Sequence, residues 1–160
     1  MAIDAELKKW IGRTATYVAP EEVGRAGIRY FALALHDDNP LYQDATYAAA
    51  SRHGDIIAPP TMVCETSQFI RQAVDENGYM GHNWPLPIKC ERFIRGGNEY
   101  EFFQPMKAGD RITVTWKILD IYERETRAFG AAVFVISEAR YVNHNDDLLA
   151  INRETNIYAS

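Results

Sequence analysis

Long hydrophobic runs and clustered basic residues are both missing from this sequence. No apolar stretch reaches the length that crosses a membrane, and residues 1–12 hold no apolar core of signal-peptide length, so we expect a soluble, cytoplasmic protein. There is no run of lysine or arginine, and the net charge is -5. Nucleic acid is therefore not expected as a partner, because its phosphates require a basic surface.

Cysteine is scarce as well. The two cysteines, Cys64 and Cys90, stand far apart and lack metal-ligand spacing, so we expect two reduced packing residues and neither a disulfide framework nor a metal site. His53, His82 and His144 are scattered, which indicates surface groups rather than metal ligands.

The remaining composition is that of an ordinary globular chain. At 160 residues and 47% apolar content, the chain is long enough for one domain with its own core. It contains no internal repeat, linker or low-complexity tract. We therefore expect a single domain over residues 1–160.

A helical pattern in residues 56–78 stands at the centre of the chain. Its apolar residues recur at spacings of three and four after Pro59 and Pro60, which suit a helix start, and Gly78 suits the position just past the end. This predicts a helix of about four turns. Because the later segments are strand-like and too many to lie beside one helix, the sheet is expected to curve around it.

The second half of the chain has the alternation of strands. The segment 112–118 alternates apolar and polar residues, as a strand buried on one face does, and 131–142 is apolar on both faces in its first half, as a central strand is. Gly96 and Gly97 predict a bend or bulge. The expected strands are 13–18, 88–95, 98–104, 112–118, 131–142 and 148–158.

Short helices are expected in the first half. A lead-in helix is expected over 5–10, and a second helix begins at Pro20 and ends before the loop 36–40, because a residue before proline avoids helical geometry. The predicted inward face of this second helix comprises Val23, Ala26, Tyr30, Phe31 and Ala34. Asp44 is expected to cap a short helix that Gly54 stops.

The loop after the second helix is dense in polar and titratable groups. Within seven positions it carries His36, Asp37, Asp38, Asn39 and Tyr42. Such a cluster is typical of a functional site, although a loop between helices is also commonly polar for solvation alone. Residues alone leave both interpretations open.

Several motifs resemble those of one enzyme family. They are Tyr30-Phe31-Ala32, the run 36–44 (HDDNPLYQD), Tyr47-Ala48, 56–62 (IIAPPTM), 96–102 (GGNEYEF) and 108–110 (AGD). With the final pair of expected strands they cover nearly the whole chain, and they resemble the MaoC-like dehydratases and (R)-specific enoyl-CoA hydratases, most closely the FAS1-like branch. The resemblance implies an α+β hot-dog domain, in which a curled antiparallel β-sheet surrounds a long central helix.

The resemblance also implies a reaction. Adding water to a double bond beside a thioester requires a base for the water, an acid for the alpha carbon and hydrogen-bond donors for the carbonyl. Catalytic members use an Asp and a His five positions apart, and backbone N–H groups near the start of the long helix. Here Asp37 falls on the Asp position, but Tyr42 takes the place of the His, and Pro60, which has no N–H, stands where those members have a glycine.

These departures predict a subunit that does not complete an active site alone. The leading hypothesis is the groove-shaping partner of a smaller catalytic MaoC-like subunit in a heteromeric hydratase. Its substrate is an acyl-CoA or acyl-carrier-protein thioester with a bulky acyl group, such as a steroid side chain or a long fatty chain, and no other cofactor is expected. Asp37 and Tyr42 are a degenerate catalytic pair, and the expected substrate-binding residues are Asn39, Ala58, Thr61, Met62 and Arg92.

Other interpretations stay open. A homodimeric hydratase would use Asp37 with Tyr42 or His36, a hot-dog thioesterase would use a carboxylate on the central helix such as Glu65, and a scaffold would bind acyl-CoA without catalysis. Arg92 and Arg95 suit either the phosphates of coenzyme A or an exposed strand face. The aromatic residues Trp84, Phe93, Phe102 and Phe103 are expected mostly in the core.

Overall fold

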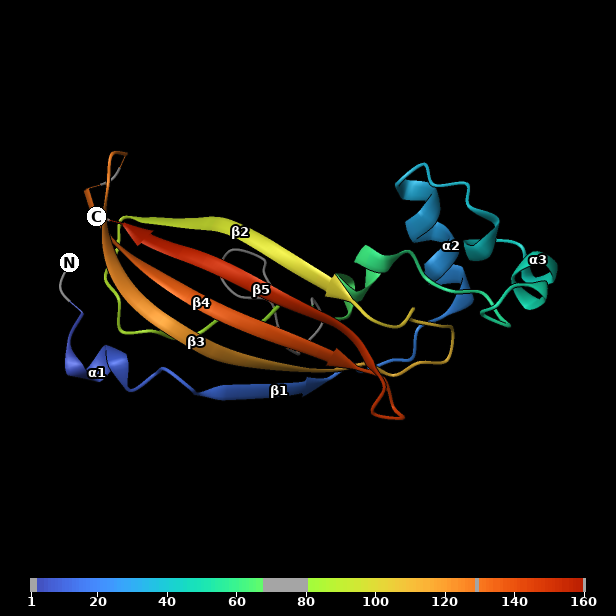
Figure 1. Ribbon diagram of the computed structural model, residues 1–160, viewed down its shortest axis with the longest axis horizontal. Coiled ribbons are helices and arrows are strands. Elements are labelled where there is room, and N and C mark those ends of the chain that lie inside the picture. The colour runs from blue at the N-terminus through green and yellow to red at the C-terminus, as the bar shows by residue number, and fades with distance from the viewer. Residues whose placement is uncertain (1–2, 68–80, 129, 160) are drawn as a thin grey trace.

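The computed structural model describes residues 3–67, 81–128 and 130–159. Its main feature is one antiparallel sheet in the order β1-β3-β4-β5-β2, with α2 and α3 clustered beyond one end of the sheet (Figure 1). The strands are β1 (Thr14–Val18), β2 (Arg92–Phe102), β3 (Thr113–Thr126), β4 (Gly130–Val142) and β5 (Leu148–Ala159). This confirms the α+β class.

The helices are short and lie in the first half of the chain. They are α1 (Ala5–Lys8), α2 (Arg25–Ala34) and α3 (Ala45–Ala50), with two 3₁₀ segments, η1 (Pro40–Tyr42) and η2 (Pro60–Ser67). The cap of α3 is the predicted one: Asp44 Oδ1 accepts the N–H groups of Thr46 and Tyr47 at 2.9 and 3.0 Å.

The strand predictions of the second half are confirmed. Ile112, Val114, Trp116 and Ile118 are all at most 5% exposed, while the residues between them are more accessible, so this segment buries one face as its alternation predicts. In β4 the run 132–135 is buried on both faces. Predicted segments 88–95 and 98–104 overlap one strand, β2, which excludes residues 88–91 and 103–104 and has a register shift between Arg95 and Gly97 where a bulge was expected.

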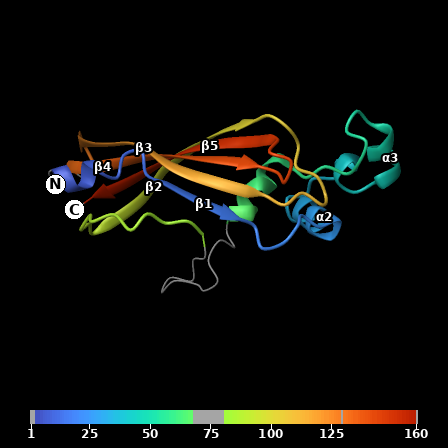
Figure 2. The same cartoon turned by 90° about the horizontal axis from the view of Figure 1, so that it is seen from below.

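One face of the sheet, here called the inner face, carries the main core. It contains Val133, Val135, Ser137, Ala139 and Tyr141 of β4, and the paired residues of β3 and β5. The segment 81–91 runs along this side of the sheet (Figure 2), and the indole of Trp84 donates to Ser137 Oγ at 3.0 Å. That segment is therefore anchored to the middle of β4.

The expected face of α2 was wrong. The helix begins at Arg25 rather than at Pro20, and it buries Ile28 and Ala32, whereas Tyr30 is 62% exposed. The expected face was aligned on Val23, which is buried but precedes the helix, whereas inside the helix Ile28 and Ala32 share the face that meets the core. Gly27 of α2 faces the Met62 methyl group of η2, and a Cβ at this position would make an ordinary contact of 3.6 Å with that methyl group.

The start of the predicted central helix also differs. The described part, Pro60–Ser67, is a 3₁₀ helix rather than an α-helix. A 3₁₀ turn is common at a helix start, and here the Met62 N–H donates to the Pro59 carbonyl at 2.9 Å. The rest of the prediction, over residues 68–78, lies outside the described residues.

Two glycine-to-alanine substitutions test this packing, because one should lower the free energy of unfolding and the other should raise it. A Cβ at Gly96 would lie 2.9 Å from Ile157 Cδ1 and 3.1 Å from Thr155 Cγ2, so we expect Gly96→Ala to destabilise the fold by about 1–2 kcal/mol. Gly27→Ala, with only an ordinary 3.6 Å contact inside α2, should stabilise it by about 0.5–1 kcal/mol. Urea unfolding measures the free energy of unfolding of both variants. An equal change in the two variants would contradict the packing described for Gly96 and Gly27.

Candidate functional site

The predicted site loop begins at the end of α2. The N–H groups of His36 and Asp37 donate to the Leu33 and Ala32 carbonyls at 3.0 and 2.9 Å, with His36 in the left-handed region at φ 55°. This pattern is a Schellman motif with histidine at the position usually held by glycine. It leaves the His36 side chain exposed and turns Asp37 back toward the fold.

Asp37, Asn39 and Tyr42 are brought together by local hydrogen bonds. Asp37 Oδ1 accepts the Asn39 N–H at 3.1 Å, and Asn39 Oδ1 accepts the Leu41 N–H at 3.0 Å, which caps η1. Gln43 Nε2 donates to the Asp37 carbonyl at 3.0 Å. The loop is therefore built by its own polar groups, and Tyr42 is carried into the core at 8% exposure.

The phenol of Tyr42 is held in its neutral form. Burial raises the pKa of Tyr42, the negative charge of Asp37 raises this pKa further, and a hydrogen bond with the Asn39 side chain opposes them. The residue at the histidine position of the motif thus keeps its proton at neutral pH. It can donate a hydrogen bond, but it is a poor proton carrier between two partners.

Ala58 lies at a junction of three chain segments, formed by Leu41, Ile57–Ala58 and Met106–Lys107. Ile57 N–H donates to the Leu41 carbonyl at 3.2 Å, and Ala58 N–H donates to the Met106 carbonyl at 2.8 Å. Ile57 also forms an isolated antiparallel bridge with Lys107. Because the Ala58 N–H already has an internal acceptor, it is not available to hold a substrate carbonyl.

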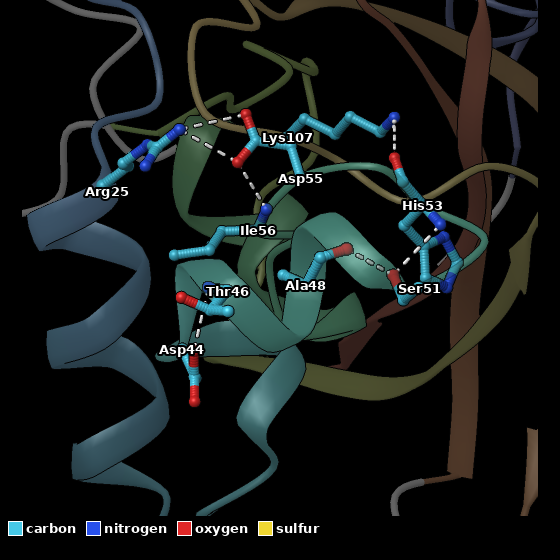
Figure 3. Close-up of polar contacts among 9 residues, drawn as sticks. All are labelled: Arg25, Asp44, Thr46, Ala48, Ser51, His53, Asp55, Ile56 and Lys107. Atoms are coloured by element: carbon cyan, nitrogen blue, oxygen red, sulfur yellow. Dashed lines mark hydrogen bonds and ion pairs between the residues drawn. The ribbon is translucent and has the colours of Figure 1, made fainter.

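Side chains around the junction fix α2 and α3 against it (Figure 3). Arg25 donates to both carboxylate oxygens of Asp55 at 2.9 and 3.1 Å, and Asp55 Oδ1 accepts the Ile56 N–H at 2.7 Å. From the other side, Lys107 Nζ donates to the His53 carbonyl at 2.8 Å. The turn between α3 and η2 is therefore bonded to α2 through Arg25 and to the segment after β2 through Lys107.

A cavity of about 270 Å³ opens beside the junction. Tyr42 and Ala58 form part of its wall, Phe102 and Phe103 come from the end of β2, and Arg52 lies at its polar side. The other wall residues are mostly apolar, as in Leu41, Ile57, Val63, Met106, Leu149 and Ala150. A mostly apolar cavity with a few polar groups has the usual character of a small-molecule site.

Three of the predicted substrate-binding residues, Thr61, Met62 and Arg92, do not line this cavity. Thr61 is exposed on η2, and Met62 is half-buried against α2, so both are near the cavity without lining it. Arg92 lies at the start of β2, opposite Ala159, about 33 Å along the strand from Phe102. The structure therefore does not bring Arg92 to the Tyr42 cavity, and its substrate role stays a prediction.

Several side chains are not where the sequence placed them. Phe93, Phe102 and Phe103 are 45–52% exposed rather than core residues, because they lie on the edge strand and its end. His82 is not a surface group: it stacks on Trp116 at 4.8 Å and its Nδ1 lies 3.0 Å from the Tyr17 hydroxyl. No spacing signal in the sequence marked Arg52 as a neighbour of the Tyr42 cavity.

Two kinds of feature are absent from the described residues. They contain no group of three metal-ligating side chains placed to hold an ion. No helix among them is long and apolar enough to cross a membrane.

The described residues thus form a curled antiparallel sheet with a helical cluster at one end, where an Asp-Asn-Tyr loop adjoins a cavity. The family described as "FAS1-like, dehydratase domain region" matches residues 9–152. The chain therefore belongs to the FAS1-like dehydratase family, and the resemblance seen in its motifs is confirmed. A UPF0336 protein of Streptomyces coelicolor is 40% identical over 115 residues, which cover 72% of this chain and 71% of that protein.

Solved structures show the same fold. A chain of the ChsH1-ChsH2 complex from Mycobacterium tuberculosis matches with a TM-score of 0.75 and 17% identity, over 98% of this chain and 93% of that chain. The C-terminally truncated HadBC (3R-hydroxyacyl-ACP dehydratase) complex from the same organism matches with a TM-score of 0.66 and 22% identity, over 91% and 96%. These neighbours are MaoC-like hot-dog proteins, which confirms the predicted hot-dog fold.

The electrostatic coupling of Asp37 and Tyr42 can be tested directly. We expect the pKa of Tyr42, followed by NMR of ring-labelled tyrosine and assigned with Tyr42→Phe, to lie above the ordinary value and to fall in Asp37→Asn. The amide retains an oxygen for the Asn39 N–H, so the loop should persist. Asp38→Asn is the matched control on the exposed side of the loop. An unchanged Tyr42 titration in Asp37→Asn would show that the two groups do not interact.

Proposed function

We propose that this chain is the groove-shaping subunit of a heteromeric 3-hydroxyacyl-thioester dehydratase, also described as an enoyl-CoA hydratase in the reverse direction. Its substrate is an acyl thioester of coenzyme A or a carrier protein with a bulky acyl group. A smaller MaoC-like partner supplies the Asp and His that transfer the protons. The single observation that carries the proposal is the buried, protonated Tyr42 at the histidine position.

The carbonyl site supports the same proposal. Hydration builds negative charge on the thioester carbonyl oxygen, which hydrogen-bond donors must stabilise. In this chain the Ala58 N–H is bonded to Met106, and Pro60 has no N–H to offer. The proton carrier and the hydrogen-bond donor to the substrate carbonyl must then both come from another subunit. This favours a heteromeric enzyme over a chain that catalyses the reaction alone.

The cavity gives this subunit a positive role. Its mostly apolar wall, with Phe102 and Phe103 at an exposed end, suits the acyl part of a substrate rather than its reacting atoms. The similarity to ChsH1-ChsH2 and HadBC, both described as complexes, supports a hetero-oligomer. β2 is an edge strand of the sheet, and an unpaired strand edge is a natural place for a second hot-dog subunit to associate.

The self-sufficient alternative finds less support. His36 is exposed at the end of α2 and is held there by the Schellman motif, whereas Asp37 turns inward. A proton pair made of His36 and Asp37 would require this helix end to open. The thioesterase alternative depends on Glu65, whose side chain lies outside the described residues.

The proposal predicts where activity resides. The chain should be purified alone and together with the protein encoded by its neighbouring gene, and hydration of enoyl-CoA substrates should be followed by the loss of their ultraviolet absorbance. We expect no turnover by the chain alone and turnover by the pair. In the pair, Asp37→Ala and Tyr42→Phe should change kcat by less than about tenfold, because removing a true proton carrier costs roughly 10²–10⁴-fold.

The matched control is replacement of the Asp of the partner's own motif, which should abolish the activity of the pair. Turnover by the isolated chain that disappears in Asp37→Ala would refute the helper role and favour the homodimeric enzyme. Binding of acyl-CoA with no effect on the partner's turnover would favour a scaffold.

A further inference from the structure

A second and larger cavity, of about 640 Å³, lies on the inner face of the sheet. Its wall is formed by inner-face residues of β2 and β5, including Phe93 and Asn156, and by segment 82–86. Asn156 is six residues along β5 from Ala150, which lines the cavity of Tyr42. Six residues of a strand span about 20 Å, so the two cavities are separate places on one face.

The cavity has an unusual polar wall. Asn152, Glu154 and Asn156 alternate along β5, so all three face inward, and all are at most 8% exposed. Asn156 Nδ2 donates to Glu154 Oε1 at 2.6 Å, but Asn156 Oδ1 is buried and has no hydrogen-bond partner among the residues that the structure describes. A buried acceptor without a donor is unfavourable, and a ligand that donates to it would remove that cost.

The charge of this wall is balanced. Glu154 is 6% exposed, and its Oε2 accepts from Arg95 Nη2 at 2.8 Å. Both residues line the cavity. Because the carboxylate already has a cation beside it, a charged ligand would meet no uncompensated charge of opposite sign. A neutral ligand is favoured for this reason.

Tyr158 supplies a complementary group on the same wall. It is two residues from Asn156 on the same face of β5, about 7 Å along the strand. Burial raises the pKa of Tyr158 to about 12, and the charges of Cys90 and Glu154 add to the effect, so the phenol keeps its O–H. The wall therefore presents an acceptor on Asn156 and a donor on Tyr158, which is the pattern that a hydroxyl group matches.

The rest of the wall combines apolar surface with the polar side chains of His82 and Asn83. Trp84 and Leu86 come from segment 82–86, and Phe93 meets the Tyr158 ring edge-to-face with centroids 5.2 Å apart. These surfaces suit an aliphatic or ring-shaped body.

We propose that this cavity binds a neutral, largely apolar molecule that carries a hydroxyl group, with the hydroxyl donating to Asn156 Oδ1. This site is distinct from the cavity of Tyr42. It does not depend on the proposed dehydratase role, so either proposal can fail without the other.

The proposal is tested with three probes that share one apolar body. Calorimetric titration of the full chain with decan-1-ol, decyl methyl ether and decylamine compares a donor, an acceptor alone and a cation. We expect decan-1-ol to bind about tenfold more tightly than the ether, the difference that one net hydrogen bond supplies. Decylamine should bind more weakly than decan-1-ol.

The chain offers a matched pair of variants. Asn156→Leu removes the acceptor and should abolish the preference for the alcohol over the ether. Asn152→Leu is the control, because Asn152 is 2% exposed, is on the same face and has an Oδ1 that no described residue bonds, but it does not line the cavity. Circular dichroism checks that both variants fold. If Asn156→Leu does not fold, Leu86→Trp, which fills the cavity, should abolish binding of decan-1-ol instead.

Several outcomes would overturn the proposal. Equal binding of the alcohol and the ether would show an apolar cavity without hydroxyl recognition, and tightest binding of decylamine would show a cation site. A preference that persists in Asn156→Leu, or that Asn152→Leu loses equally, would place the hydroxyl elsewhere. Absence of binding by all three probes would contradict the site itself.

Discussion

The arrangement of the candidate site depends on two backbone hydrogen bonds. Ile57 N–H to the Leu41 carbonyl and Ala58 N–H to the Met106 carbonyl join three stretches that are far apart in the sequence. Each such bond contributes only about 1 kcal/mol net, so burial of Ile56, Ile57 and Ala58 supplies most of the stabilisation. The hydrogen bonds supply direction, because they fix which side of η1 faces the end of the sheet.

The same geometry limits the chemistry of this chain. Once Ala58 N–H is used to hold the junction, it cannot also stabilise an oxyanion, and the proline at position 60 removes another donor. Burial of Tyr42 at the adjoining wall then stabilises the neutral phenol. The hydrogen bonds that hold the junction together therefore also occupy a backbone donor beside Tyr42, next to a cavity lined mostly by apolar residues.

Those features of the fold that depend on a short local pattern could be predicted from the sequence. The strand at 112–118, the cap at Asp44 and the bulge at Gly96 and Gly97 each follow from a short pattern with one physical meaning. The buried face of α2 could not, because Pro20 gave a false start signal and the predicted face was aligned on Val23, which is buried but lies before the helix. The cavity of Tyr42 could not either, since its wall joins the ends of β2 and β5 to the turn after α3, and no sequence pattern encodes that long-range contact.

The inner face of β5 shows how far tertiary structure can override local pattern. Alternation alone would place Ile151 and Ile157 inward and Asn152, Glu154 and Asn156 toward solvent, yet the strand buries the polar set. β5 is paired on both sides, and a slip by one residue would turn Ala150 and Tyr158 outward as well, so the register holds the polar set inside.

The buried polar residues of β5, Asn152, Glu154 and Asn156, are stabilised mainly by side chains of the edge strand β2. Arg95 pairs with Glu154, and Asn98 accepts from Asn152 Nδ2 at 3.0 Å, so β2 is attached to β5 by side-chain hydrogen bonds as well as by the ladder. The two sides of the sheet are therefore stabilised differently. Apolar packing holds β3 against β4, whereas hydrogen bonds between polar side chains link β5 to β2. The Arg95–Glu154 and Asn98–Asn152 pairs keep their hydrogen bonds beside an open space, whereas apolar side chains in that position would lose packing contacts. The half of the sheet that contains the edge strand is therefore the half able to keep a large cavity open.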